Sequence, residues 1–266
     1  MIKLTDQEFK DLYTFVKSNY GINLEKKRQL IESRMNSVLA DKGFKNYTDY
    51  LKFVNSNPNE ITVVLNKLTT NHTYFLREPE HFDFLTKTIL PEIKVTNDAT
   101  KEMRIWSAGC STGEEAYTTI MTLKDFFGMD RWDYRILATD ISTHVMESAK
   151  VGVYSPESIA NIPKAWEKYF KKTPDDLYLL SDEIKREVIF RKLNLMDSFS
   201  FKKPFDLIFC RNVMIYFDQP TKDKLVNKYY DVLKPGGYLF IGHSETISRN
   251  ATKFEYVQPS IYRKGK

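Results

Sequence analysis

The sequence has few cysteines, no long apolar run and no internal repeat, and each absence narrows the classes of protein it can encode. Cys110 and Cys210 are its two cysteines, and neither is part of a metal-ligand spacing, so we expect no disulfide framework and no metal site. No apolar run approaches the roughly 20 residues of a membrane-spanning helix. Residues 1–6 become acidic at once and lack the apolar core of a signal peptide. We therefore expect a cytoplasmic protein that does not insert into a membrane.

The composition is that of a globular protein. Its 266 residues, 42% of them apolar, can bury a sizeable core in one large domain or two modest ones. The formal net charge of +5 is mild. It is compatible with an acidic partner, and equally with a surface that is simply well solvated.

The N-terminal third contains helical patterns alone. Residues 5–8 form a capping box ahead of apolar residues at helical spacing. Further helices are predicted at about residues 24–40, 47–54, 58–68 and 79–95. The polar segment 96–102 is predicted to be a linker. We therefore predict a helical N-terminal domain over residues 1–95.

From residue 103 onward, strand and helix patterns alternate. Strands are predicted at residues 103–108, 133–139, 205–210 and 238–241, and helices at 113–127, 142–150 and 219–233. Such alternation predicts an α/β domain over residues 103–266, with a mostly parallel sheet covered on both faces. Residues 177–193 interrupt this rhythm. We predict a hairpin there around residues 181–183, as a small antiparallel insertion.

The most informative segment is residues 104–115, where an apolar strand enters a small-residue turn that opens directly into a helix. The next predicted strand ends in Asp140. In a Rossmann-like unit, glycines in such a turn let the backbone approach a nucleotide, and the second carboxylate holds its ribose. This turn has only Gly109 and Gly113, and two glutamates begin the helix, so a pyrophosphate would be repelled. A nucleoside with a positive centre and no phosphates fits better, and S-adenosylmethionine is such a molecule.

Other residues are brought to the same sheet edge by their positions in the chain. Glu115 can meet the amino group or sulfonium of the cofactor, unless it merely complements the helix dipole. Arg211 and Asn212 follow an almost entirely apolar strand, so they emerge at the rim where open α/β sheets bind ligands. With Gly109 and Asp140 they are candidate cofactor-binding residues. The alternative for Asp140 is a solvated strand-end or helix N-cap carboxylate.

Four blocks of the chain closely resemble the CheR family of chemotaxis receptor methyltransferases. They are residues 70–78, 106–115, 209–217, and 233–237 with 242–245. The resemblance extends over nearly the whole chain, including the helical part and the predicted hairpin. It implies an all-α domain followed by a Rossmann-like S-adenosylmethionine methyltransferase domain. It also implies that glutamate side chains on the cytoplasmic helices of methyl-accepting chemotaxis receptors are esterified, leaving S-adenosylhomocysteine.

The resemblance also implies roles for individual residues. Cofactor contacts are implied for Asn71, Thr73, Arg77, Asn194 and Leu195. Arg77 and Tyr216 are further implied to lie near the transferred methyl group. From the residues alone, Arg77 would be interpreted as a surface residue at a helix start. A plain loop at residues 194–195 and a core aromatic at Tyr216 are the alternatives for those positions.

The second predicted helix carries candidate receptor-binding residues. These are Lys27, Arg28 and Arg34, and the first and last are seven residues apart, hence on one helical face. A basic face can steer the enzyme onto receptor glutamates. A solvated face with internal ion pairs explains the same pattern. We expect a monomer.

The expected reaction needs no general base, because a carboxylate at neutral pH already carries free lone pairs. That agrees with the lack of any Ser/His/Asp or Cys/His set. A nucleic-acid methyltransferase, for example of RNA, would share the cofactor half. However, no Asn/Asp-Pro-Pro-Tyr/Phe block follows residues 205–210, and a charge of +5 is low for phosphate binding. A non-catalytic cofactor-sensing or receptor-binding module would need damage at Asp140, Arg77 or Tyr216, and all three are present.

Overall fold

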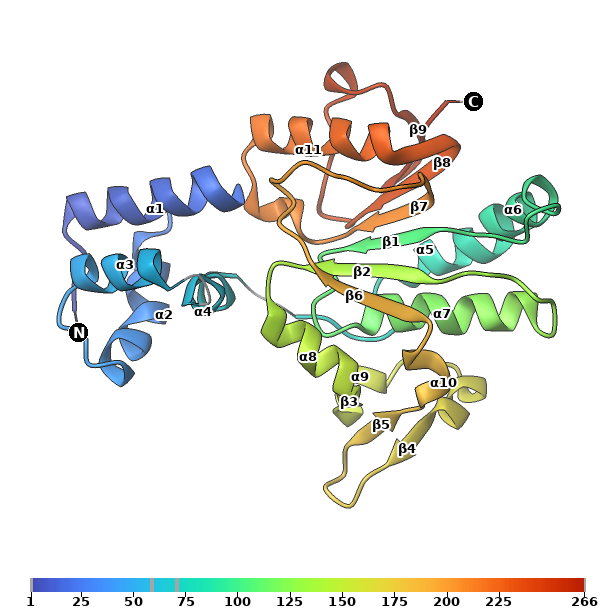
Figure 1. The fold of residues 1–266 in the computed structure, drawn as a ribbon, viewed down its shortest axis with the longest axis horizontal. Coiled ribbons are helices and arrows are strands. Elements are labelled where there is room, and N and C mark those ends of the chain that lie inside the picture. The colour runs from blue at the N-terminus through green and yellow to red at the C-terminus, as the bar shows by residue number, and fades with distance from the viewer. Residues whose placement is uncertain (1, 58–59, 70–71, 266) are drawn as a thin grey trace.

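The computed structural model describes residues 2–57, 60–69 and 72–265. Figure 1 shows a small helical body at one end of the molecule, joined to a larger part built on a sheet. The helices of this body are α1 (Asp6–Tyr20), α2 (Arg28–Asp41), α3 (Tyr47–Ser56) and α4 (Glu60–Leu68). Helix α1 begins with the predicted capping box between Thr5 and Glu8. Helix α2 begins later than predicted, so that Lys27 is its N-cap.

Buried polar contacts join the helices of this body to one another. The carboxylate of Glu8 accepts hydrogen bonds from the backbone and hydroxyl of Thr48 at the start of α3, at 2.8 and 2.9 Å. The hydroxyl of Tyr50 donates to Glu60 of α4 at 2.9 Å, and Lys42 pairs with the same carboxylate at 3.0 Å. Glu8, Tyr50 and Glu60 are buried, so these contacts satisfy polar groups that lie away from water, and they fix how the helices pack.

The larger part is built on a seven-stranded sheet in the order β6-β2-β1-β7-β8-β10-β9. Its strands are β1 (Ile105–Ala108), β2 (Ile136–Asp140), β6 (Val188–Lys192), β7 (Phe205–Cys210), β8 (Leu233–Ile241), β9 (Glu255–Gln258) and β10 (Ile261–Arg263). The first five strands in this spatial order pair in parallel. Strand β10 pairs antiparallel with both β8 and β9. All residues of β1 and β7 are buried, because helices cover both faces. The predicted α/β fold class is confirmed.

Successive residues of each strand face opposite layers of helix. Trp106 and Ile208 belong to an apolar cluster with α11 (Gln219–Val232) and the N-terminal helices. Ile105 and Leu207 belong to a second cluster, together with residues of four helical segments. These are α5 (Pro79–Phe84), the π-helical η1 (Leu85–Ile89), α6 (Leu90–Thr96) and α7 (Glu114–Phe127). Residues 79–96 therefore pack on the sheet, and the domain division predicted at 96–102 stays a prediction.

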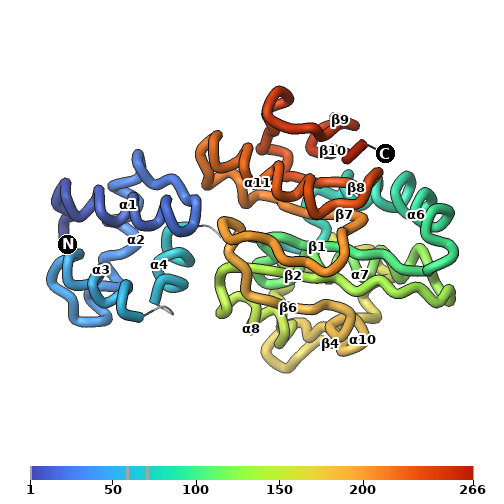
Figure 2. The backbone as a smooth tube through the Cα atoms, turned by 45° about the horizontal axis from the view of Figure 1, so that its top comes forward, coloured from blue at the N-terminus to red at the C-terminus, as the bar shows by residue number. Residues whose placement is uncertain are grey.

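A small antiparallel sheet, in the order β3-β5-β4, projects beyond the β6 edge (Figures 1 and 2). It consists of β3 (Val153–Tyr154), β4 (Phe170–Lys172) and β5 (Tyr178–Leu180). The remaining helices are α8 (Thr143–Val151), α9 (Pro156–Ile159), α10 (Asp182–Lys185) and the 3-10 helices η2 (Lys164–Tyr169), η3 (Met214–Tyr216) and η4 (Arg249–Ala251). Among the described residues, no helix combines the length and apolarity needed to cross a bilayer.

The predicted hairpin around residues 181–183 is wrong, although the antiparallel insertion exists. Residues 182–185 form α10, and β5 pairs with β3 and β4. Strand β6 instead pairs in parallel with β2 at the edge of the large sheet. Val188 and Phe190 are buried there while Ile189 is partly exposed. The alternation of apolar residues reveals a half-buried strand, but it does not reveal which strand is its partner.

Candidate active site

The carboxyl ends of β1, β2 and β7 meet around a cavity of about 260 Å³. Most of the predicted site residues line it, namely Thr73, Arg77, Gly109, Glu115, Asp140, Asn194, Leu195, Arg211, Asn212 and Tyr216. Asn71 lies outside the described residues. Lys27, Arg28 and Arg34 do not line the cavity. The topology thus brings together residues from five separate segments of the chain.

The turn after β1 is held close to its neighbours by backbone contacts. The N–H groups of Gly109 and Cys110 donate to the carbonyl oxygen of Thr139, at 2.8 and 2.9 Å. Gly109 has a φ of +90°, and a Cβ atom at this position would lie 2.4 Å from Cγ2 of Val213. A side chain here is excluded both by conformation and by space, so the glycine lets the turn pack against the loop after β7.

Asp140 ends β2 with its carboxylate fixed by two backbone amides. The N–H of Ser111 donates to Oδ2 and that of Ser142 to Oδ1, both at 2.9 Å. Burial raises the pKa of Asp140 above its ordinary value, and these donors oppose the rise. Helix α8 is capped by Ser142, whose hydroxyl accepts from the N–H of Val145. The alternative of Asp140 as a helix N-cap is therefore wrong.

Arg211 is the centre of a buried ionic network, with its side chain only 2% exposed. Its guanidinium pairs with Glu78 at 3.2 Å and with Glu115 at 3.1 Å, and it donates to the backbone carbonyl of Arg77. Glu115 also accepts from the hydroxyl of Ser107 at 2.6 Å. Burial raises the pKa of Glu115, while the adjacent Arg211 lowers it. Arg211 thus fixes the segment that carries Arg77, and Glu115 is more than a complement to the helix dipole.

Glu245, four residues after β8, fixes the loop that follows β7. Its buried carboxylate accepts N–H bonds from Asn212 at 2.9 Å, Ile215 at 3.1 Å and Gly242 at 2.6 Å. Asn212 has a φ of +58°, so the loop turns sharply at this residue. Sequence analysis missed this function of Glu245. Its signal was the block 242–245, but the block does not say which amides the carboxylate accepts.

The helical body also contributes to the cavity wall, which sequence analysis did not predict. Tyr20, Ile22, Leu65 and Thr69 line the cavity. Ile22 forms an isolated antiparallel bridge with Phe217. Beside it, the N–H of Asn23 donates to the carbonyl of Tyr216 at 2.7 Å. Because these segments lie nearly 200 residues apart in the chain, no local pattern could have paired them.

Arg77 and Asn194 differ in how far their side chains are already engaged. Arg77 is half-buried and donates to the carbonyl of His72 at 2.6 Å. The amide of Asn194 donates to the carbonyl of Asn19 at 2.7 Å and accepts from the N–H of Met196 at 3.0 Å. Asn194 therefore shapes the cavity wall through contacts within the protein, next to Leu195.

Two of the three predicted receptor-binding cations are bonded within the helical body. Arg28 pairs with Asp6, and Arg34 donates to the carbonyls of Lys67 and Thr69, both at 3.1 Å. Lys27 is exposed and precedes α2. Lys27 is the N-cap of α2 and its carbonyl accepts the first helical bond, from Ile31, so the common face predicted for Lys27 and Arg34 stays a prediction.

Comparison with known proteins gives matches over both parts of the chain. Residues 7–69 match the family described as CheR methyltransferase, all-alpha domain, and residues 71–263 match CheR methyltransferase, SAM binding domain. The chain belongs to the CheR methyltransferase family. It is thus an enzyme that uses S-adenosylmethionine, as predicted.

Curated relatives of this CheR chain are similar along their whole length. It is 48% identical to the chemotaxis protein methyltransferase of Borreliella burgdorferi, over 99% of this chain and 96% of that protein. It is 35% identical to the chemotaxis protein methyltransferase of Escherichia coli, over 98% and 92%. It is also 35% identical to chemotaxis protein methyltransferase 2 of Vibrio cholerae, over 95% and 90%. This CheR chain is therefore a chemotaxis protein methyltransferase.

The cavity of this CheR chain suits a cationic cofactor. The carboxylates of Glu115 and Asp140 line it, and the guanidinium of Arg211 is already paired with Glu78 and Glu115. Phosphate groups would face these carboxylates at close range, whereas a sulfonium and an amino group are attracted by them. The residues present therefore fit S-adenosylmethionine.

Proposed function

We propose that this protein esterifies glutamate side chains of methyl-accepting chemotaxis receptors. The observation that carries the proposal is the electrostatic layout of the cavity in a chain similar throughout to chemotaxis protein methyltransferases. Two fixed carboxylates line the cavity, together with two arginines. Arg211 is ion-paired, whereas Arg77 is half-buried and bonds a neutral carbonyl. An anionic side chain can approach Arg77 without breaking an ion pair.

In this proposal each site residue has a defined task. Asp140 accepts hydrogen bonds from the ribose hydroxyls, and Glu115 faces the positive end of the cofactor. Gly109 and Asn212 supply close backbone approach. Thr73 contacts the cofactor from the segment before α5, and Asn194 and Leu195 contact the adenine. A cofactor contact of Asn71, which lies outside the described residues, stays a prediction.

Asp140 provides a direct test of the cofactor assignment. We expect Asp140→Asn to weaken binding of S-adenosylmethionine about tenfold or more, because hydrogen bonds to a charged acceptor contribute about 1.5–3 kcal/mol. Isothermal titration calorimetry measures this directly. Asp175→Asn, an exposed aspartate far from the cavity, serves as the control. Unchanged affinity of the Asp140 variant would exclude the ribose contact.

The reaction requires the protein mainly to align the reactants and to exclude water from around them. When bound, S-adenosylmethionine would supply a methyl group on a sulfonium; the substrate's carboxylate oxygen would bond to the methyl carbon in line as the carbon–sulfur bond breaks, with S-adenosylhomocysteine as the leaving group. The substrate carboxylate is ionised at neutral pH, so no residue has to act as general base. Arg77 orients that carboxylate, while Tyr216 helps to exclude water from opposing charges that cancel as they react. Alignment of reacting atoms contributes roughly 7–11 kcal/mol in favourable cases.

We further propose that the helical body and the exposed Lys27 meet the receptor's cytoplasmic helical bundle. In this arrangement the helical body of α1–α4 recognises the receptor, and the sheet domain, with the helices packed on it, binds the cofactor. A cation at an exposed surface contributes mainly to the rate of encounter with acidic helices. The protein acts here as a monomer, without nucleic acid or insertion into the membrane.

The deciding experiment uses S-adenosylmethionine with a labelled methyl group, offered with a receptor cytoplasmic fragment or with RNA. We expect label on the receptor fragment that mild base releases as methanol, since glutamyl methyl esters hydrolyse readily. Mass spectrometry then locates the modified glutamates. Base-stable label, or label on RNA, would overturn the proposal.

A further inference from the structure

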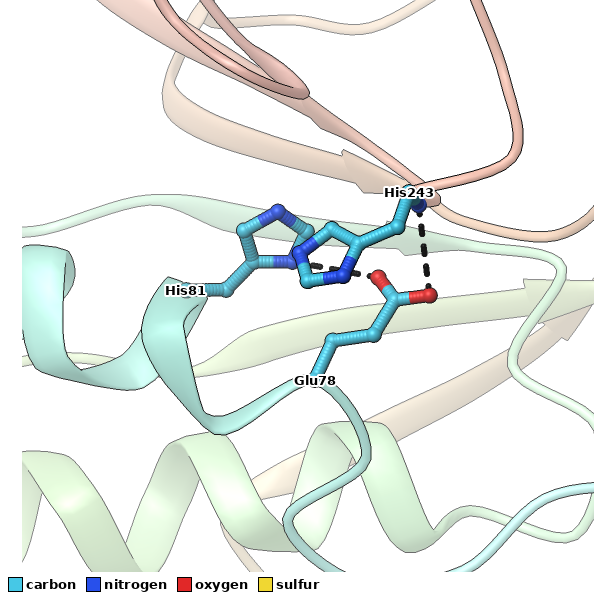
Figure 3. A group of neighbouring side chains, drawn as sticks. All are labelled: Glu78, His81 and His243. Atoms are coloured by element: carbon cyan, nitrogen blue, oxygen red, sulfur yellow. Dashed lines mark hydrogen bonds and ion pairs between the residues drawn. The ribbon is translucent and has the colours of Figure 1, made fainter.

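Three side chains that can bind a metal converge beside the cavity, but outside its wall. They are Glu78, His81 and His243, and one ligand atom of each lies within 4.8 Å of the other two. Glu78 and His81 are at the start of α5, while His243 follows β8. Figure 3 shows the two imidazole rings side by side, with the carboxylate of Glu78 next to both residues.

Among the described residues, the buried imidazole of His81 has no hydrogen-bond partner. Its side chain is 1% exposed, and both ring nitrogens lack a partner among the residues that the structure describes. Its Nδ1 atom lies 3.5 Å from Oε2 of Glu78, which is too long for a good hydrogen bond. The ring packs 5.0 Å from that of Phe240 and 4.9 Å from that of His243, measured between centroids. A buried group without partners calls for an explanation, and one is an ion that the structure does not contain.

Glu78 shares its cationic partner, Arg211, with a second carboxylate. Glu78 and Glu115 share the guanidinium of Arg211, so the ionised network carries one negative charge in excess. Glu78 itself is held in place by Arg211 at 3.2 Å and by longer contacts to the N–H of His243 and the amide of Asn212, at 3.3 and 3.4 Å. Metal-binding carboxylates are commonly oriented by such outer hydrogen bonds.

We propose that Glu78, His81 and His243 form a binding site for a divalent cation of the zinc class. Two imidazoles and one carboxylate are a common zinc ligand set, whereas magnesium and calcium prefer oxygen ligands. Zinc bonds of about 2.0–2.2 Å place tetrahedral ligand atoms roughly 3.4 Å apart. The cluster must therefore contract by about 1.4 Å at most. The exposed His243 can supply this movement, and its solvent side leaves the fourth position to water.

The site would act on the segment that carries Arg77. Glu78 is the next residue, and its partner Arg211 donates to the carbonyl of Arg77. An ion bound here stiffens this segment without entering the cavity. The sequence analysis expected no metal site because neither cysteine has a metal-ligand spacing. Glu78 and His243 are 165 residues apart, so no local pattern marks them as a ligand pair.

The test is titration of the chelator-treated, full-length protein with Zn²⁺ in a calorimeter, and with Co²⁺ in an absorption spectrometer. We expect one ion per chain and a tetrahedral Co²⁺ spectrum. His243→Ala should lower the affinity at least about tenfold, because it removes a direct ligand. His144→Ala is the matched control, since His144 is an exposed histidine on α8. Cys110 and Cys210 are buried and do not compete for the ion.

A second variant guards against loss of folding. His81→Phe keeps an aromatic ring beside Phe240 and should also lose the ion, with its unfolding transition in chelator near that of the wild type. Zn²⁺ should raise the Tm of the wild type and of the His144 variant, but not that of the His243 variant. Absence of binding to the wild type, equal binding by the His243 variant, or equal loss in the His144 variant would each overturn the proposal.

Discussion

At the scale of single residues, the two arginines at the cavity differ in their partners. One is ion-paired within the protein, and the other keeps its guanidinium at the cavity. Arg211 is almost completely buried and is satisfied by Glu78, Glu115 and the carbonyl of Arg77. Removing it would leave two carboxylates without their partner in a water-poor region, which is strongly destabilising. Arg77 donates to a backbone carbonyl and keeps its guanidinium at the cavity. The two arginines thus differ in burial and in partners, and we propose that only Arg77 is available to a ligand.

This difference predicts a kinetic signature for Arg77. We expect Arg77→Ala to lower kcat about 100-fold, because removing one preorganised hydrogen-bond donor from the active site of an enzyme typically has an effect of this size. The Kd of S-adenosylmethionine should change far less. Steady-state kinetics with a receptor fragment and cofactor calorimetry separate the two effects. Arg186→Ala, which removes an exposed arginine of the small-sheet region, is the control. Equal turnover of the Arg77 variant and the wild type would refute the proposed function of this arginine.

The residues that sequence analysis found share one property. Gly109 and Arg211 come directly after strands and Asp140 ends one, at the sheet edge where the rule for ligand sites in parallel sheets applies. The same rule does not identify Glu78 and Glu245, because their functions depend on partners that other elements supply. A buried carboxylate looks the same in the sequence whether it binds a ligand, pairs with an arginine or accepts backbone amides.

At the scale of elements, the loop after β7 owes its shape to one carboxylate. Glu245→Gln keeps the size of the side chain but turns an amide NH₂ toward backbone N–H donors. We expect a loss of about 1–3 kcal/mol in the free energy of unfolding, and weaker cofactor binding through Asn212. Urea denaturation and calorimetry measure the two. Glu147→Gln on the exposed face of α8 is the matched substitution. If the Glu245 variant matched the wild type in both measurements, the loop would not depend on this carboxylate.

Helix α2 allows recognition and stability to be separated. Lys27→Glu should raise the KM for the receptor fragment about threefold, more at low salt, because an exposed charge contributes under about 1 kcal/mol. Its Tm and cofactor Kd should stay unchanged.

Arg34→Ala should instead lower stability by about 1 kcal/mol, because the carbonyls of Lys67 and Thr69 lose their donor at the end of α4. Thermal unfolding and receptor kinetics distinguish the two variants. The opposite pattern would assign receptor binding to Arg34.

At the scale of the whole molecule, an ion pair joins the helical body to the sheet domain. Lys17 of α1 lies 2.8 Å from Asp218, which also caps α11 by accepting the N–H of Thr221 at 3.1 Å. The hydrogen bond from Lys17 is the main cause that lowers the pKa of Asp218 to about 2. Together with the Ile22–Phe217 bridge, this contact keeps the helical body against the mouth of the cavity.

The depressed pKa of Asp218 has a predictable effect on stability. Because the carboxylate is more acidic in the folded state, its contribution is complete above the unfolded pKa of about 4 and is lost as the pH falls toward 2. Asp218→Asn should therefore cost about 1 kcal/mol at neutral pH, and flatten the decline in unfolding free energy between these pH values.

Chemical denaturation over a pH series measures this effect, with Asp175→Asn as the control. An equally steep acid decline in the Asp218 variant would show that this ion pair does not stabilise the fold.

From the sequence alone one can derive the helical body, the parallel sheet and the strand ends that carry Gly109, Asp140 and Arg211. These follow from periodicity and from short-range turn chemistry, which are local in the chain. The partner of β6, the contact of Asn23 with the Tyr216 loop and the ionic network of Arg211 arise only on folding. They join segments far apart in the chain, and their free energy comes from burial and charge compensation that no local pattern encodes.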